Sequence, residues 1–246
     1  MRRFFRLYQI EQKLFFRSGD VFIFNLCMPV AAMLMIGFIG GNQQAGISGM
    51  TYLQSAFASV TAVGICCSAF MSIPIVLVDY RDKKILKHIY CSPCNPARIM
   101  AVNVLSSGVM AMLSAVLVGM TAWFVFGYRM EGNAAVFCGA WFLTMMAMFS
   151  IGLLVAALCK TVKAMNVATT VLYFPMLFLS GATIPCELFP EQLQAVAGVL
   201  PLGVGIRLMK SASMGSMQSE SLWQAVILLV ITAACVLTAV GTFRWE

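Results

Sequence analysis

Residues 134–159 read AAVFCGAWFLTMMAMFSIGLLVAALC and contain no Lys, Arg, Asp, Glu or His. The stretch is longer than the roughly 20 apolar residues that a helix needs to cross the hydrocarbon core of a bilayer. Outward from it, uncharged apolar stretches of similar length occur at 21–41, 53–78, 99–126, 164–184 and 222–243. The alternating segments of about ten residues that transmembrane β-strands would show are absent. The sequence therefore predicts an all-α integral membrane protein with six transmembrane helices.

The composition of the chain agrees with this prediction. Of its 246 residues, 61% are hydrophobic and 10% are charged, whereas soluble domains average about 45–50% and 25%. The mean hydropathy is +0.91. The charged side chains are too few to cover the surface of a soluble domain of this size. A soluble globular protein, a disordered chain and a nucleic-acid-binding protein are all excluded.

The net charge of +7 is explained by the predicted topology. Thirteen of the 16 Lys and Arg residues fall on one side, in the two terminal tails and in the connections at 79–98 and 160–163. Only Arg129, Arg207 and Lys210 fall on the other side. The positive-inside rule then predicts that both termini are cytoplasmic. Because no organelle-targeting feature is present, we expect a multi-pass protein of a bacterial inner membrane.

Residues 1–20, MRRFFRLYQIEQKLFFRSGD, mix basic and aromatic side chains ahead of the first span. This pattern favours an amphipathic helix that lies in the plane of the cytoplasmic interface, with membrane lipid as its partner. The alternative is a basic tail that only sets the topology. Residues 21–246 are then expected to form a single six-span transmembrane domain.

The connection at 79–98, DYRDKKILKHIYCSPCNPAR, joins the second and third spans and holds five cations and the only His of the chain. Ile85, Leu86 and Ile89 fall on one possible helical face, and Pro93 and Pro96 would end that helix. A short charged helix held between two spans can act as a lever, because whatever grips it moves both spans. The alternative is a loop that only holds the hairpin on the cytoplasmic side.

The connection at 185–221 has a different character. It begins at Pro185, contains Pro190 and passes through an apolar run that ends at Pro201. That run is too short to cross a bilayer, so we expect a re-entrant or interfacial helix on the outer side. Kinks are also expected at the prolines inside the spans, which are Pro29, Pro74 and Pro175.

Catalytic and nucleotide-binding motifs are absent. The sequence contains no G-x-x-x-x-G-K-[ST], no H-E-x-x-H and no G-x-S-x-G. The spans also lack the ionisable residues that an intramembrane enzyme or an ion-driven carrier would use. The most polar residues in the spans are three asparagines that either line a pathway or form helix–helix hydrogen bonds: Asn25, Asn103 and Asn166.

His88, Cys91 and Cys94 form H-x-x-C-x-x-C in the 79–98 connection. A structural zinc site needs four nitrogen or sulfur ligands, and no fourth lies nearby in the sequence. We therefore expect no metal site and interpret these residues as part of a solvated loop.

Two stretches resemble the permease subunit of ABC-2 type exporters. Residues 79–99, DYRDKKILKHIYCSPCNPARI, are similar to the coupling segment of that family, although the R-E-x-G-T-L found in many relatives is replaced. Residues 178–201, FLSGATIPCELFPEQLQAVAGVLP, are similar to the end of the fifth span and the outer helix of the family. With the six-span layout, the resemblance extends over nearly the whole chain.

The resemblance implies a transport subunit that is not itself an enzyme and forms half of a translocation pathway. It would work with two copies of a separate ABC ATPase, which binds ATP and Mg²⁺, and with a second copy of itself or a related permease. The ATPase would contact the coupling residues Arg81, Asp82, Lys83, Lys84, Ile85, Leu86, Lys87 and His88. The outer gate would include Pro185, Glu187, Pro190, Glu191 and Pro201.

The resemblance also suggests a cargo, namely drugs, antibiotic peptides or lipid-like amphiphiles, with glycans second. Two other functions share the topology and are kept as alternatives. One is a membrane scaffold or assembly factor that transports nothing, and the other is a secondary carrier. Nucleotide-dependent movement would argue against a scaffold, and transport driven by an ion gradient would favour a carrier.

Overall fold

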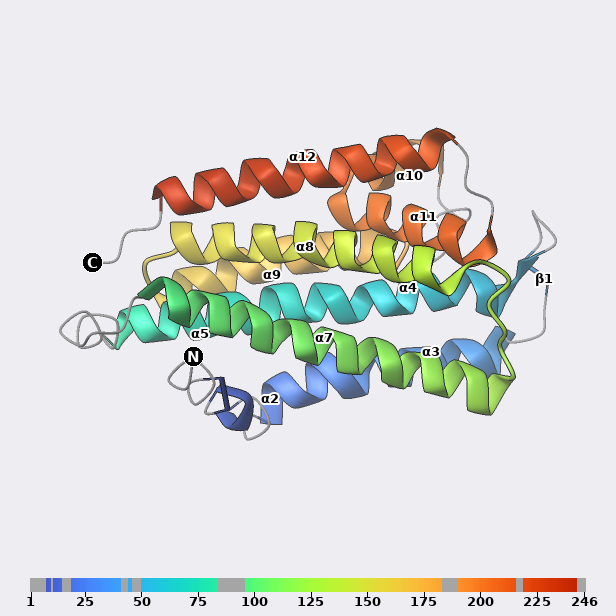
Figure 1. Cartoon of the computed structure of the whole chain (residues 1–246), viewed down its shortest axis with the longest axis horizontal. Helices are drawn as coiled ribbons and strands as arrows, with labels where there is room; N and C mark the ends of the chain where they lie inside the picture. The colour runs from blue at the N-terminus through green and yellow to red at the C-terminus, as the bar shows by residue number, and fades with distance from the viewer. Residues whose placement is uncertain are drawn as a thin grey trace.

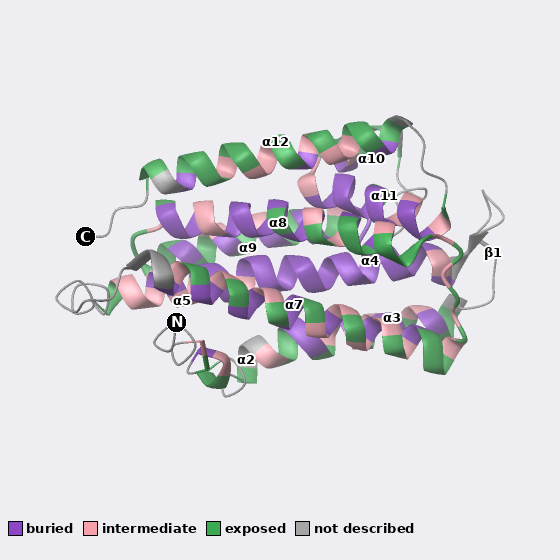
Figure 2. Cartoon of the chain, viewed as in Figure 1, coloured by how far each residue is buried: buried purple, intermediate pink, exposed green. Residues whose placement is uncertain are grey.

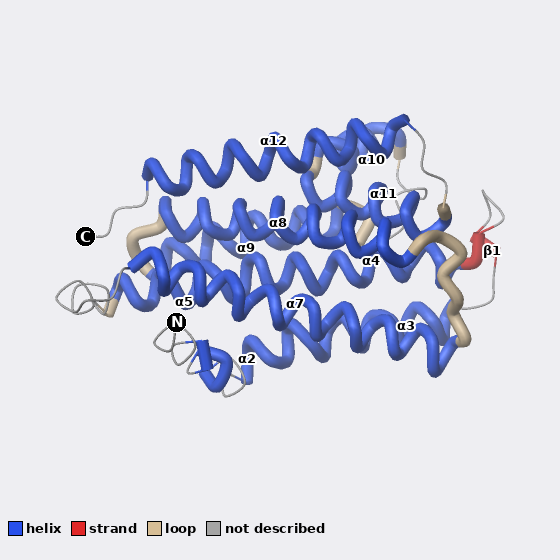
Figure 3. Tube along the Cα trace, viewed as in Figure 1, coloured by secondary structure: helices blue, strands red, loops and turns tan. Residues whose placement is uncertain are grey.

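The computed structural model describes residues 8–9, 11–14, 19–40, 44–45, 50–83, 96–182, 190–215 and 219–242. Figure 3 shows that these residues form a bundle of elongated helices with one very short strand pair at one end. The pair consists of β1 (Gln44–Ala45) and β2 (Met50–Thr51), which are antiparallel with Gln44 opposite Thr51. The prediction of an all-α membrane fold is confirmed, since the strand pair only closes a hairpin.

The helices follow one another along the chain as the span pattern predicts (Figure 1). The first part of the chain contributes α2 (Gly19–Phe22), η1 (Ile23–Cys27), α3 (Met28–Gly40), α4 (Tyr52–Cys67), η2 (Ser68–Ser72) and α5 (Ile73–Asp82), where η marks a π-helical turn. The remainder contributes α7 (Pro96–Phe126), α8 (Ala134–Leu158), α9 (Val162–Leu179), α10 (Glu191–Val199), α11 (Pro201–Met214) and α12 (Ser219–Thr242).

Among the described residues, five helices are long and apolar enough to cross a membrane: Leu53–Asp82, Ile99–Phe126, Ala134–Leu158, Val162–Leu179 and Glu220–Ala239. They match five of the six predicted spans. The predicted first span corresponds to a shorter apolar helix, Ile23–Ile39. Helical structure nevertheless runs without a break from Gly19 to Gly40. At 1.5 Å per residue, that run matches the thickness of a hydrocarbon core of about 30 Å.

Several predicted span boundaries differ from the structure, and two of the differences have a clear physical reason. The second span continues past Val78 to Asp82, because its charged last turn can remain helical at the membrane surface. The fifth span ends at Leu179, before the predicted residue 184. Its helix stops there because Gly181 adopts a φ of 81°, a left-handed conformation that ends helices and suits glycine.

The π-helical turns explain what two of the predicted proline kinks become. Proline has no N–H, and its ring clashes with the carbonyl four residues earlier. The turn η1 precedes Pro29, and η2 precedes Pro74. A wider turn at these places relieves the clash without ending the helix. Pro175, by contrast, lies inside the continuous helix α9.

The helix Leu53–Asp82 forms the centre of the bundle. In its most apolar 18-residue window 83% of the residues are buried, whereas the corresponding figure for Glu220–Ala239 is 11%. Figure 2 shows the same contrast, with a largely purple α4 inside the bundle and a mostly green α12 outside it. The buried side chains that this helix itself contributes to the core include Phe57, Ile65, Phe70, Ile73 and Leu77.

The bundle has two chemically different ends. Figure 1 places the end of α5, the α8–α9 connection and the end of α12 at one end, which we call the α5 end. The strand pair and the 127–133 connection lie at the opposite, β1 end. Arg81, Lys83, Lys160 and Lys163 belong to segments at the α5 end, whereas Arg129 belongs to the 127–133 connection. Of these five cations, four therefore belong to the α5 end and one to the β1 end.

Candidate functional site

The charged last turn of α5 is attached to the neighbouring helix α8. The Nη1 of Arg81 donates a hydrogen bond of 2.9 Å to the backbone carbonyl oxygen of Cys159, the residue that caps α8. Cationic side chains commonly satisfy such carbonyls at helix ends. Lys83 forms an ion pair of 2.8 Å with Asp79 one turn earlier. That pair is largely exposed and contributes little to stability.

Three predicted coupling residues are therefore placed at the α5 end. Asp82 and Lys83 are exposed, and Arg81 is half-buried. Lys84, Ile85, Leu86, Lys87 and His88 lie outside the described residues. Within the described residues, no group of three or more His, Cys, Asp or Glu side chains could hold a metal ion.

A second attachment joins the N-terminal region to α5. The hydroxyl of Tyr80 donates a hydrogen bond of 2.7 Å to Oε1 of Glu11, and Glu11 is only 3% exposed. Residues 8–9 and 11–14 are helical. Burial raises the pKa of the Glu11 carboxyl, and the hydrogen bond from Tyr80 opposes part of that increase. The base of the 79–98 connection is thus held from two sides, by Glu11 and by Cys159.

The raised pKa predicts how this attachment responds to pH. A carboxyl whose pKa is higher in the folded state stabilises that state fully below the ordinary value of 4.5. The contribution is lost as the pH rises through the folded-state pKa. Between pH 4.5 and pH 7.5, the thermal midpoint of the wild type should therefore fall relative to that of Glu11→Gln, which cannot ionise. Asp82→Asn, an exposed change at the same end, is the control and should follow the wild type. Parallel midpoints for wild type and Glu11→Gln would contradict the prediction.

The three predicted pathway asparagines occupy different surroundings. Asn25 in η1 is fully buried and donates a hydrogen bond of 2.8 Å to Oγ of Ser72 in η2. Its Oδ1 accepts a hydrogen bond of 3.4 Å from Ser68 of the same turn. Asn25 therefore acts as a helix–helix tie that joins the two π-helical turns.

Neither Asn103 nor Asn166 forms a side-chain hydrogen bond with this tie in the described part of the chain. Asn103 on α7 is fully buried, and neither polar atom of its amide has a hydrogen-bond partner among the described residues. Asn166 lies on the exposed face of α9. Its backbone carbonyl accepts a hydrogen bond of 2.7 Å from Thr170. Of the three, Asn25 is the one whose side chain makes a helix–helix hydrogen bond within the described residues.

The predicted outer segment forms two helices that meet at a sharp bend. Pro190 caps α10, Pro201 opens α11, and the two helix axes differ by 89°. Both helices lie in the half of the bundle toward the β1 end (Figure 1). Glu191 opens α10, while Pro185 and Glu187 lie outside the described residues.

Glycines allow α11 to approach its neighbours very closely. A Cβ on Gly203 would lie 2.1 Å from the carbonyl oxygen of Ala197 in α10. A Cβ on Gly205 would lie 2.3 Å from Cγ2 of Thr144 in α8. The residues 201–205, PLGVG, therefore seat α11 against both α10 and α8, as small residues do between membrane helices.

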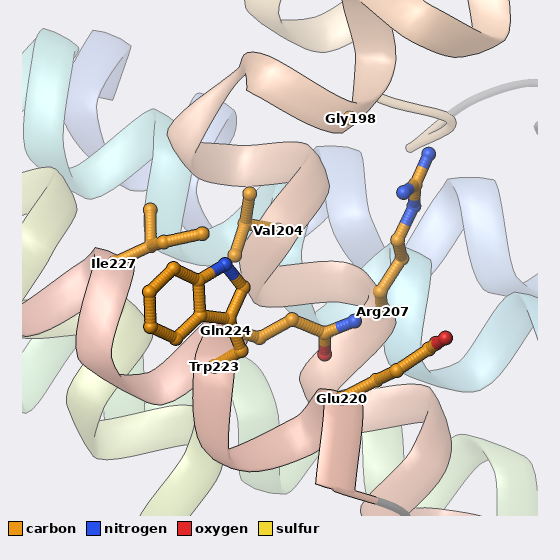
Figure 4. A pocket seen from close by; sticks show the side chains of 7 residues that line it. All are labelled: Gly198, Val204, Arg207, Glu220, Trp223, Gln224 and Ile227. Carbon is orange, nitrogen blue, oxygen red and sulfur yellow. The ribbon is translucent and has the colours of Figure 1, made fainter.

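A pocket of about 460 Å³ opens between α11 and α12. Figure 4 shows that Val204 and Arg207 reach it from α11, and Trp223, Gln224 and Ile227 reach it from α12. Gly198 at the end of α10 and Glu220 in the first turn of α12 complete the lining. We call it the α11–α12 pocket. It combines a cation, a carboxylate and an amide with an indole and two aliphatic side chains.

Sequence reasoning missed both the Glu11–Tyr80 contact and this pocket. Glu11 is the only carboxylate among the first 19 residues. A single acidic residue in a basic segment was the one sequence feature that could have indicated a specific contact. In the sequence, Arg207 is distinguished only as one of the three cations on the predicted outer side. Its surroundings depend on how α12 returns along α11, which no local pattern indicates.

Comparison with known proteins identifies the family. The model of the ABC-2 type transporter family matches residues 2–214. Nodulation protein J of Sinorhizobium fredii is 26% identical over 196 residues, which cover 76% of this chain and 72% of that protein. Two Escherichia coli proteins also align over most of the chain. Inner membrane transport permease YhhJ is 24% identical over 68% of the chain, and probable multidrug ABC transporter permease YbhR is 23% identical over 77%.

The chain spans about half the length of the two E. coli relatives, 46% of YhhJ and 51% of YbhR. The family match covers far more than half of this chain and includes the central helix, the charged end of α5 and the bent pair α10–α11. The chain therefore belongs to the ABC-2 type transporter family, and it is a membrane permease subunit of an ABC transporter.

Proposed function

We propose that this chain forms half of the translocation pathway of an ABC exporter and is moved by two copies of a separate ATPase that bind ATP and Mg²⁺. The ATPase grips the connection that follows α5, residues 79–98. In this proposal Arg81, Asp82 and Lys83, with the residues up to His88, form the contact surface.

The observation that carries the proposal is the position of the helix Leu53–Asp82. It is the most buried of the candidate spans, and its last turn leads directly into the charged connection. A force applied at Asp82 would pass along the helix axis into the centre of the bundle. The contacts of Arg81 with Cys159 and of Tyr80 with Glu11 would transmit part of it to α8 and to the N-terminal region.

The same proposal assigns the orientation. The α5 end carries most of the described cations and would face the cytoplasm, with both termini on that side, in agreement with the positive-inside rule. The pair α10–α11 would then be a re-entrant outer gate. In a bacterial cell the bilayer would be the inner membrane, as the name of the relative YhhJ states for that protein.

We assign the exposed face of α9 to contact with a second permease. This face carries Asn166 and Thr170 beside Val167 and Val171. The exposed face of α12 toward the β1 end is apolar, with Leu222, Val226, Leu229 and Val230 as members. Hydrocarbon does not satisfy a carboxamide, whereas another protein or an aqueous path does. The face of α9 therefore suits a partner subunit better than lipid.

Photo-crosslinking tests this assignment. With p-benzoylphenylalanine in place of Asn166, irradiation should give a covalent dimer or a covalent adduct with a related permease. The same group in place of Val230, which is 61% exposed on α12, is the matched control and should crosslink only to lipid. Equal protein adducts from both positions, or adducts from Val230 alone, would refute the α9 interface.

For the cargo we propose amphiphiles, namely drugs, antibiotic peptides or lipid-like compounds. Charged groups are confined to the ends of the described spans, so a strongly charged cargo would have no counter-charge inside the bundle. The relative YbhR carries the name of a probable multidrug permease. In nanodiscs that contain the permease and its ATPase, amphiphilic compounds should stimulate ATP hydrolysis, whereas equally sized hydrophilic sugars should not. Stimulation by sugars alone would reverse this assignment.

A further inference from the structure

The α11–α12 pocket presents opposite charges on its two walls. The guanidinium of Arg207 projects from α11, and the carboxylate of Glu220 projects from α12 (Figure 4). The two groups do not form an ion pair with each other. The amide of Gln224 also lines the pocket, with Val204 and Ile227 as the apolar part of the lining.

Arg207 retains donors for a ligand. Its Nη2 donates to the carbonyl oxygen of Gln194 at 3.3 Å, which uses one of five N–H groups. Both terminal nitrogens lie 3.3 Å from where a Cβ would stand on Gly198, so this glycine leaves room for the guanidinium. Within the described part of the chain, no carboxylate lies within ion-pair distance of Arg207. A planar cation with free donors is suited to a phosphate.

The α12 wall presents acceptors instead. The Oε1 of Gln224 is buried and has no hydrogen-bond partner among the described residues. Glu220 adds an exposed carboxylate one turn earlier. A buried acceptor without a donor costs free energy. A ligand with N–H donors would satisfy Gln224 and pair with Glu220 at the same time.

The pocket is also continuous with an exposed apolar surface of α12. Trp223 is 69% exposed, and Leu222 beside it is 72% exposed. Leu229 and Val230 continue the exposed apolar face along α12. Tryptophan side chains gather where hydrocarbon meets headgroups, and Glu220 is the first residue of this candidate span. The polar part of the pocket is therefore at headgroup depth, with acyl-chain surface next to it.

We propose that the α11–α12 pocket binds an aminophospholipid of the bilayer, with a phosphate and a primary ammonium in its headgroup, as in phosphatidylethanolamine. Arg207 binds the phosphate, Glu220 and the Oε1 of Gln224 accept hydrogen bonds from the ammonium, and the acyl chains lie along α12. The ligand would thus join α11, which is held firmly against α8, to the exposed helix α12. The proposal does not depend on the ATPase or on the transported cargo.

Lipid titration of the purified chain tests the proposal. The chain in detergent is titrated with phosphatidylethanolamine, phosphatidylcholine and phosphatidylglycerol of identical acyl chains, and bound lipid is counted by native mass spectrometry. Phosphatidylethanolamine should bind most tightly, because the choline headgroup has no N–H donor and the glycerol headgroup has no cation. Arg207→Gln should weaken phosphatidylethanolamine and phosphatidylglycerol alike, by about tenfold, as expected for a lost charge-assisted hydrogen bond.

Variants on α12 separate binding from folding. Glu220→Gln should reduce the preference for phosphatidylethanolamine while leaving phosphatidylglycerol unchanged. Gln224→Leu should weaken phosphatidylethanolamine and leave the thermal midpoint unchanged or higher, because it removes a buried acceptor without a partner. Arg129→Gln removes an exposed cation at the β1 end outside the pocket and is the matched control. Equal binding of the three lipids, or equal losses in Arg207→Gln and Arg129→Gln, would overturn the proposal.

Discussion

Replacement of residues 81–88 by a Gly/Ser linker of the same length is expected to uncouple the permease from its ATPase. The linker removes the hydrogen bond from Arg81 to Cys159 and the charged surface proposed to meet the ATPase. Coupling free energies between distant sites are typically 1–3 kcal/mol, so stimulation of ATP hydrolysis by cargo should fall about tenfold or more. The measurement is ATP hydrolysis with and without cargo in nanodiscs that contain the permease and its ATPase.

Single substitutions in the same segment should reduce the stimulation of ATP hydrolysis by smaller amounts. Arg81→Gln should lose part of the stimulation, because it weakens the attachment of α5 to α8. Lys83→Glu should lower ATPase co-purification as well, since it reverses an exposed charge at the proposed contact. Arg129→Glu reverses a charge at the opposite end and should behave as the wild type. If the linker variant keeps full stimulation, residues 81–88 are not the coupling segment.

The second large effect is expected at Gly152 on α8. A Cβ at this position would lie 2.3 Å from the backbone carbonyl oxygen of Ala69 in η2. Because that contact is with backbone, no side-chain movement can relieve it. Gly152→Ala should destabilise the bundle by about 1–3 kcal/mol, the usual cost of overpacking, and Gly152→Leu by more. The thermal midpoint in detergent is the measurement.

Gly139 on the same helix is a matched control. No atom lies within 4 Å of a Cβ built there, and the residue is exposed. Gly139→Ala should therefore raise the midpoint slightly, since alanine favours a helix over glycine by about 1 kcal/mol. A midpoint for Gly152→Ala equal to that of Gly139→Ala would show that α8 and η2 separate without loss of stability.

The sequence was sufficient to predict the spans but not their contacts. Residues 99–126 were predicted as a span and are found as one with the same limits, because a bilayer requires a long uncharged helix wherever the chain crosses it. The observed end of a span differs from the predicted end where the backbone conformation of Gly181 stops the helix. It also differs where the helix continues into its charged last turn, as at Asp82.

Contacts between distant segments could not be predicted in this way. Asn25 meets Ser72 across 47 positions, and Tyr80 meets Glu11 across 69. Hydropathy records which residues avoid water but not which helices pack together. The composition suggested that each asparagine joined helices or lined a pathway, and only Asn25 forms a helix–helix hydrogen bond among the described residues. The α11–α12 pocket depends on the 89° bend after α10, which prolines permit but do not dictate.

The π-helical turn η2 means that the chain can lose one residue between α4 and α5 without a change in the direction in which α5 faces. Successive residues in an α-helix are about 100° apart, and a π-helical turn holds one residue more than an α-helical turn. Deletion of one residue within Ser68–Ser72 would remove this extra residue and let the helix continue in regular α geometry. Tyr80 and Arg81 would then still face Glu11 and Cys159. The same deletion inside the regular helix α4 would instead rotate everything after it by about 100°. In a sequence alignment, a one-residue gap at Ser68–Ser72 would therefore signify a harmless change of length, whereas a gap within α4 would signify a reoriented α5.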